Sequence, residues 1–184
     1  VLATPGSFNT PLGLTRTINE HLTDRHRFLV AEMGAYKEGE IAELCDLVHP
    51  TIGVLTAIGP AHLDRFGSME AIRRAKYEIV TSLPAQGTAI MNVDDPEVRA
   101  LADRTRNVTV VRYGIDPEAA PDVTATDIEV GRDGTSFVVV DKRTGDSVSA
   151  TTRLLGRHSI GHVLAATAAA IASGRRIADL APAI

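Results

Sequence analysis

The sequence predicts an α/β fold: a doubly wound, mostly parallel sheet with helices on both faces, plus a small three-stranded antiparallel sheet. Two observations predict it. Over residues 1–114, segments with helical spacing of apolar residues alternate with continuous apolar runs, a pattern typical of a parallel sheet covered on both sides. Over residues 115–155, short, partly alternating stretches are separated by "GRDG" and "TGD", which favour hairpin turns.

The elements of residues 1–114 follow in order after an opening strand edge and loop. We expect helices over residues 10–22, 39–48, 68–83 and 95–105. We expect buried strands over residues 27–34, 51–59, 88–93 and 107–114. Ser68 and Asp95 are suited to the N-cap positions of their helices, and Pro96 to a first helical position.

Two smaller parts complete the chain, which we treat as one domain over residues 1–184. Three strands are expected within residues 115–155, at 122–130, 135–143 and 146–154. Residues 156–184 form a C-terminal helical part, in which an Ala-rich helix over 156–174 is ended by Gly174.

Composition excludes several classes of protein. A chain of 184 residues with 44% hydrophobic content is long enough for one soluble core, and it lacks an apolar run long enough to span a membrane. A net charge of -4 without a Lys/Arg block argues against nucleic acid and anionic membranes as partners. The single Cys45 cannot form an internal disulfide and is expected to be buried, which indicates a reducing compartment such as the cytoplasm.

A carboxylate and an imidazole follow two neighbouring strands. Glu32 ends the second strand, and His62 and Asp64 lie in the loop "GPAHLDRFGS" after the third. Ligands of doubly wound sheets bind beyond the carboxyl ends of the strands, and these donors suit a cation such as Mg²⁺ that keeps waters and phosphates. Glu32 could instead cap the next helix, and His62 could be a hydrogen-bonded loop residue.

Lys76 stands on the apolar face of its helix. It is four residues from both Ile72 and Val80, whereas Arg73, Arg74 and Glu78 are expected to be solvated. A lysine there could extend its stem along the sheet edge, or it could lie close to a metal and phosphate site.

Two further polar residues lie at element ends. Asn92 ends the fourth strand and could either contact a base or hold a loop. His158 opens the Ala-rich helix, where it is either a neighbour of the N-cap or a ligand contact. No G-x-x-x-x-G-K-[ST] phosphate loop occurs in the sequence.

Five strings in order resemble the central ATPase domain of the ATP-dependent Mur ligases. They are "VLATPGSFNTPLGL", "VAEMGAYKEGEIAEL", "IGPAHLDRFGSMEAI", "AKYEIVTSL" and "GRHSIGHVLAA". The likeness is strong over residues 1–95 and 154–174 and weak over 115–150, and it is greatest to the branch that adds D-alanyl-D-alanine.

The resemblance implies ATP and Mg²⁺ as cofactors, with two metal sites in the full-length enzyme. Glu32 matches a Mg²⁺-binding glutamate, and His62 matches the histidine of the second Mg²⁺ site. Lys76 matches a lysine that is carbamylated, so that His62 and Lys76 would also serve catalysis. Residues 33–35 would then let phosphates and metal approach the backbone.

Four residues fall near adenine-binding positions of that family: Asn92, His158, Ser159 and His162. Ser159 and His162 stand where Asn is usual in the string "G.HN..NaLAA", so a changed nucleotide preference or a related ligase branch stays open. Folylpolyglutamate or cyanophycin synthetase types, and a non-catalytic nucleotide-binding domain, are the alternatives.

The implied reaction joins D-alanyl-D-alanine to a UDP-N-acetylmuramoyl tripeptide through an acyl phosphate, in peptidoglycan precursor synthesis. The implied enzyme is a cytoplasmic monomer. The phosphate-loop segment, an N-terminal UDP-sugar domain and a C-terminal domain are absent from these 184 residues, and we expect the fragment alone to be inactive.

Overall fold

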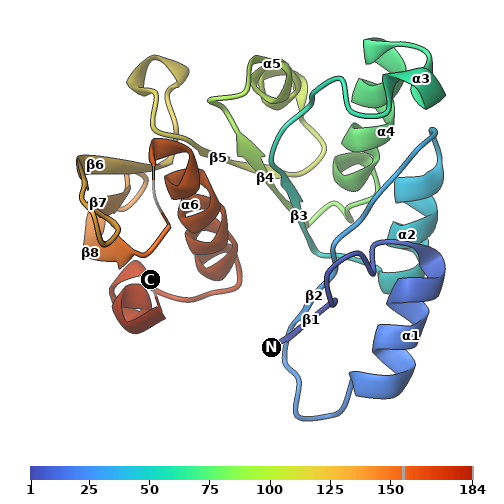
Figure 1. Cartoon of the computed structure of the whole chain (residues 1–184), viewed down its shortest axis with the longest axis horizontal. Coiled ribbons are helices and arrows are strands. Elements are labelled where there is room, and N and C mark those ends of the chain that lie inside the picture. The colour runs from blue at the N-terminus through green and yellow to red at the C-terminus, as the bar shows by residue number, and fades with distance from the viewer. Residues whose placement is uncertain (155, 184) are drawn as a thin grey trace. The chain divides into compact units, whose positions relative to one another are not determined.

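The computed structural model of the chain describes residues 1–154 and 156–183, and of residues 157, 158 and 181–183 it describes the backbone alone. The chain divides into two compact units, which are described separately (Figure 1). Unit 1 comprises Val1–Pro50 and Gly59–Ser82, and unit 2 comprises Thr51–Ile58 and Leu83–Ile184. Within the described ranges, no helix is long and apolar enough to cross a membrane.

Unit 1 combines a very small parallel sheet with four helices. Its elements are β1 (Leu2–Ala3), α1 (Pro11–His21), β2 (Leu29–Val30), α2 (Glu40–Val48), α3 (Leu63–Phe66) and α4 (Met69–Thr81). The helices predicted over 10–22, 39–48 and 68–83 are confirmed as α1, α2 and α4. Ser68 is the N-cap of α4, and its side chain accepts a hydrogen bond from the N–H of Ala71.

The strand predicted over residues 27–34 is much shorter in the structure. Only Leu29 and Val30 pair, with Leu2 and Ala3 of β1. After Val30 the strand pairing ends, because the N–H of Glu32 donates to the side-chain hydroxyl of Thr4 and not to a backbone carbonyl of β1. A continuous apolar run is therefore not sufficient to extend a strand whose partner supplies two residues.

The helix α3 was not predicted. It begins after His62 and ends before Gly67, and both flanking residues have left-handed backbone conformations. Four residues are too few for an apolar period to show in a sequence.

The core of unit 1 joins α1, α2 and the segment after β2. Its buried members are Leu14, Ala35, Ile41, Leu44 and Cys45. Cys45 is buried as expected, and that burial raises the pKa of its thiol.

Unit 2 is a mixed six-stranded sheet with helices. Its strands are β3 (Ile52–Leu55), β4 (Thr88–Asn92), β5 (Thr109–Tyr113), β6 (Val123–Val130), β7 (Thr135–Asp141) and β8 (Asp146–Thr152). The sheet is ordered β3-β4-β5-β6-β7-β8, parallel from β3 to β6 and antiparallel from β6 to β8. The predicted antiparallel strands are confirmed, and they continue the parallel sheet through the single pair Tyr113–Val123.

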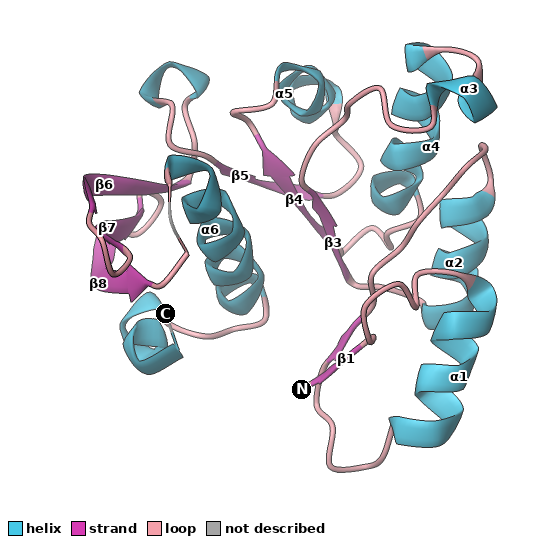
Figure 2. Cartoon of the chain, viewed as in Figure 1, coloured by secondary structure: helices cyan, strands magenta, loops and turns pink. Residues whose placement is uncertain are grey.

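The helices of unit 2 bury apolar side chains of the sheet. They are α5 (Pro96–Arg104), α6 (Arg157–Ala172) and the 3-10 helices η1 (Pro117–Ala119) and η2 (Ile177–Ala183). Figure 2 shows α6 lying along the sheet, where Ile160 and Leu164 join a core with Ile90 and Phe137. Ala89, Ile90 and Met91 are all fully buried, although neighbours in a strand face opposite ways, so β4 is covered on both faces.

Asp95 and Pro96 start α5 as predicted. The Asp95 carboxylate accepts a hydrogen bond from the N–H of Val98, and Pro96 is the first helical residue. The same carboxylate accepts from the N–H of Ile58, which ties the loop after β3 to the start of α5.

Candidate functional site

Glu32 is an exposed carboxylate directly after β2, in unit 1. Its Oε1 accepts a hydrogen bond of 3.2 Å from Nδ2 of Asn9, and its N–H is held by Thr4. The carboxylate therefore has a fixed direction without being buried, and it does not cap the helix that follows. That helix, α2, begins eight residues later and receives its cap from another residue.

Asn9 is a residue of this site that sequence reasoning missed. Its carbonyl accepts from the N–H of Gly34 at 2.9 Å, and a Cβ added to Gly34 would lie 2.9 Å from Nδ2 of Asn9. The Asn9 amide therefore occupies the space that a side chain at residue 34 would need. Met33 and Ala35 belong to the apolar core, so residues 33–35 have structural partners of their own.

His62 is an exposed imidazole at the start of α3. Its backbone has φ 58, a conformation that residues other than glycine seldom adopt. The rings of His62 and Tyr36 meet at a steep angle, with centroids 4.7 Å apart. The loop histidine is therefore held by an aromatic contact.

Lys76 is half-buried on α4, beside the buried positions Ala75 and Ile72. Within the described ranges its ammonium has no ion pair, whereas Arg74 pairs with Glu38. The partial burial agrees with the expected inward placement.

Two other residues of α4 bind the segment that leads into α2. Arg74 makes two hydrogen bonds of 2.8 Å to Glu38, and they lower the pKa of the Glu38 carboxyl. The Glu78 carboxylate accepts from the N–H groups of Gly39 and Ala42, at 2.6 and 3.0 Å. The expectation that Glu78 is solvated is therefore wrong, because this half-buried side chain caps the N-terminus of α2.

Protein side chains of this region could supply only some of the ligands of a divalent cation. Among the described residues, no group of three or more His, Cys, Asp or Glu side chains could hold a metal ion by itself. Mg²⁺ commonly binds one or two carboxylates and takes water and phosphate oxygens for the rest. The exposed donors Glu32 and His62 suit that mode of binding.

In unit 2, Asn92 holds a loop. Its Nδ2 donates to the carbonyl of Thr56 after β3, and its Oδ1 accepts from the N–H of Asp94. Both ends of the amide are engaged, so of the two roles considered for Asn92 the loop contact is the one the structure contains.

The candidates on α6 differ in their exposure. Ser159 is 5% exposed and His162 is exposed. The side chain of His158 lies outside what the structure describes. Of the two side chains that the structure describes, His162 is the one accessible to a ligand.

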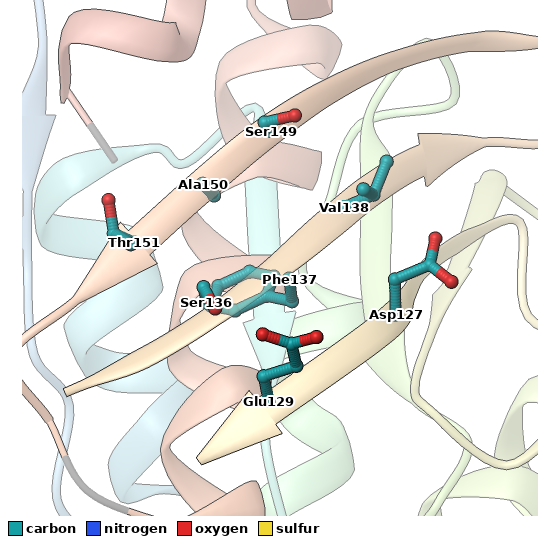
Figure 3. Close-up of a pocket in the computed structure, with 8 residues that line it drawn as sticks. All are labelled: Asp127, Glu129, Ser136, Phe137, Val138, Ser149, Ala150 and Thr151. Atoms are coloured by element: carbon teal, nitrogen blue, oxygen red, sulfur yellow. The ribbon is translucent and has the colours of Figure 1, made fainter. Parts of the chain in front are cut away.

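A shallow hollow of about 310 Å³ lies over β6, β7 and β8 (Figure 3). Asp127, Glu129, Ser136 and Thr151 line it, and none of them was singled out in the sequence. The hollow contains none of the predicted site residues.

The fold is of the α/β class, with a mostly parallel six-stranded sheet, a small two-stranded parallel sheet and helices. The expectation that Glu32 and His62 follow neighbouring strands of one sheet is wrong, because β2 pairs with β1 whereas β3 pairs with β4. Residues 1–170 match the family model described as "Mur ligase middle domain", and the chain belongs to that family. The expected resemblance is confirmed.

Relatives give a finer comparison. The chain is 37% identical over 174 residues to UDP-N-acetylmuramoyl-tripeptide--D-alanyl-D-alanine ligase of Escherichia coli (strain K12), covering 94% of this chain and 37% of that protein. It is similar to the crystal structure of MurF from Acinetobacter baumannii, with TM-score 0.87, 30% identity, and coverage of 98% of this chain and 38% of that one. For MurF ligase from Thermotoga maritima in complex with ADP, the TM-score is 0.81 at 27% identity, with coverage of 98% and 41%. The chain thus spans about two fifths of the length of these relatives.

Proposed function

We propose that this chain is the ATP-binding middle domain of a cytoplasmic ligase that joins D-alanyl-D-alanine to a UDP-N-acetylmuramoyl tripeptide. The match to the Mur ligase middle domain over residues 1–170 carries the proposal. Support for the particular acceptor comes from the E. coli relative, whose name states that substrate pair. Support for the nucleotide comes from the T. maritima structure, which contains ADP.

In the proposed reaction, the carboxylate that ends the tripeptide attacks the γ-phosphate of ATP, which gives an acyl phosphate and ADP. The amine of D-alanyl-D-alanine then attacks the acyl carbon and releases phosphate as the amide forms. Bound Mg²⁺ would neutralise charge on the phosphates. Glu32 and His62 would hold the metal, and Asn9 keeps the Glu32 carboxylate in a fixed direction.

The role proposed for Lys76 is that of a carbamate. The neutral amine would add to carbon dioxide and lose a proton, which changes a cationic side chain into an anionic one. Its half-buried position without a carboxylate partner among the described residues supports this role. In the nucleotide site we propose His162 as an adenine contact, with Asn92 holding the neighbouring loop and His158 and Ser159 at the start of α6.

Glu32→Gln in the full-length protein that contains this chain tests the proposal. ADP release is measured with the UDP-N-acetylmuramoyl tripeptide and D-alanyl-D-alanine over a range of Mg²⁺ concentrations. We expect activity to fall roughly 10- to 100-fold, with partial recovery at high Mg²⁺. Glu43→Gln, an exposed carboxylate of α2, is the control. Unchanged activity of Glu32→Gln, or a parent enzyme that prefers another amine, would count against the proposal.

Lys76→Ala tests the carbamate in the same protein. We expect ligation to be lost and then partly restored by a short-chain carboxylate such as acetate. Lys76→Arg, which keeps the positive charge but cannot form the carbamate, should be as inactive as Lys76→Ala. Full ligation by either variant would exclude this role.

A further inference from the structure

The ring of Tyr36 is the contact that orients His62. The two rings are inclined by 65° with centroids 4.7 Å apart, an edge-to-face arrangement that aromatic pairs prefer. Tyr36 is 43% exposed, so this contact lies at the surface, where a ligand can reach the imidazole. An exposed imidazole without such a neighbour would turn freely about its side-chain bonds.

Tyr36 is itself held in place from two sides. The guanidinium of Arg65 lies over its ring, 4.4 Å from the centroid, which is a cation–π contact. The backbone N–H of Tyr36 donates to Oε2 of Glu40 at 2.7 Å. The backbone of Tyr36 is therefore held by Glu40, and the face of its ring is held by Arg65.

The loop that carries Tyr36 is also tied to α4. Glu38 is bound by Arg74, and the N–H of Gly39 is bound by Glu78. On the other side of Tyr36, the N–H of Gly34 donates to the carbonyl of Asn9, so Tyr36 belongs to a segment with contacts at both ends, although it lies outside any helix or strand.

The backbone of the His62 turn brings the same groups together from the other side. His62 adopts φ 58, a conformation that persists in a non-glycine residue only where the surroundings hold it. Its carbonyl accepts from the N–H of Arg65 at 2.9 Å. One tight turn therefore places an imidazole and a guanidinium against one aromatic ring.

We propose that Tyr36 is a positioning residue that aims the imidazole of His62, with Arg65 holding the Tyr36 ring. The inference rests on the proposed function, in which His62 is a metal donor. A donor that already points in one direction loses less conformational freedom when the metal binds. The ring performs this task through its face and edge, so the Tyr36 hydroxyl is dispensable.

The experiment compares Tyr36→Leu, Tyr36→Phe, Arg65→Met and His62→Ala in the full-length protein. Leu63→Ala is the matched control, because it removes an exposed apolar side chain from the same short helix. The Mg²⁺ concentration that gives half of the maximal ligation rate should rise roughly tenfold in Tyr36→Leu and in His62→Ala. Arg65→Met should show a smaller rise, and the conservative Tyr36→Phe should keep the parent value.

An NMR measurement separates the positioning role of Tyr36 from the metal-binding role of His62. In protein labelled with ¹³C at histidine Cε1, the signal absent from His62→Ala belongs to His62, and it should shift in Tyr36→Leu because the neighbouring ring current is lost. An unchanged Mg²⁺ requirement in His62→Ala would overturn the metal role of His62. The NMR signal would then still test whether Tyr36 positions the imidazole. An unchanged signal in Tyr36→Leu would overturn the positioning itself. Thermal unfolding checks that each variant folds. If Tyr36→Leu does not fold, the test is made with Arg65→Met.

Discussion

The two units of the chain are stabilised by different means. Unit 2 has a six-stranded sheet and a broad apolar core, to which α6 contributes fully buried side chains such as Leu164. Unit 1 has strands of two residues, and its loops are tied by polar side chains, among them Asn9 and Glu78. The candidate metal donors lie in unit 1. Their geometry should therefore depend on a few surface hydrogen bonds more than on the core.

The largest expected effect comes from the core of unit 2. Leu164→Ala removes a fully buried side chain and leaves a cavity beneath the sheet-packed face of α6. We expect the free energy of unfolding to fall by about 2 to 5 kcal/mol. Urea unfolding followed by circular dichroism measures it.

The control for that substitution is Leu154→Ala, at a position in the same unit that is 51% exposed. It should change the free energy of unfolding by no more than about 0.5 kcal/mol. Equal losses in the free energy of unfolding for Leu164→Ala and Leu154→Ala would show that burial of the Leu164 side chain does not stabilise unit 2.

An intermediate effect is expected from the cap of α2. Glu78→Ala leaves the N–H groups of Gly39 and Ala42 without their acceptor. Glu43→Ala removes the same charge from the first turn of α2, where its side chain is exposed. We expect Glu78→Ala to be the more destabilising by about 1 to 2 kcal/mol. Urea unfolding gives the difference, and hydrogen exchange should speed up at the amides of Gly39 and Ala42. Equal losses for the two variants would contradict the capping role.

The smallest effect on stability should come from Gly34→Ala. The new Cβ would meet the end of the Asn9 side chain, which can rotate away at a cost of about 1 kcal/mol or less. Rotation breaks the bond from Asn9 to Glu32, so the Mg²⁺ requirement of the full-length protein should rise even though stability hardly changes. Gly59→Ala, where an added Cβ meets nothing within 4 Å, should change neither quantity. A Gly34→Ala protein with an unaltered Mg²⁺ requirement would show that Glu32 does not need Asn9.

Features with local causes could be predicted from the sequence. Ser68, Asp95 and Pro96 mark helix starts through contacts within a few residues, and each was assigned correctly. The change from parallel to antiparallel strands was also predicted, because periodicity and turn residues are local signals.

Features that depend on distant partners could not be predicted. Asn9 and Glu32 are 23 residues apart, and Gly39 and Glu78 are 39 apart, so neither contact has a spacing rule. One signal for Glu78 was present, however. Gly39 begins a helix without a side chain that could cap it, so an acceptor must come from elsewhere. The length of β2 likewise depends on how far β1 runs beside it.

The bond between Glu78 and Gly39 also has a consequence for synthesis of the chain. The acceptor for the N–H of Gly39, the N-cap residue of α2, is synthesised 39 residues after Gly39. At ordinary rates of translation this interval lasts roughly 2 to 8 s, during which α2 emerges from the ribosome before the residue that caps it. The start of α2, and with it the loop that carries Tyr36, can reach its final form only after α4 has been synthesised.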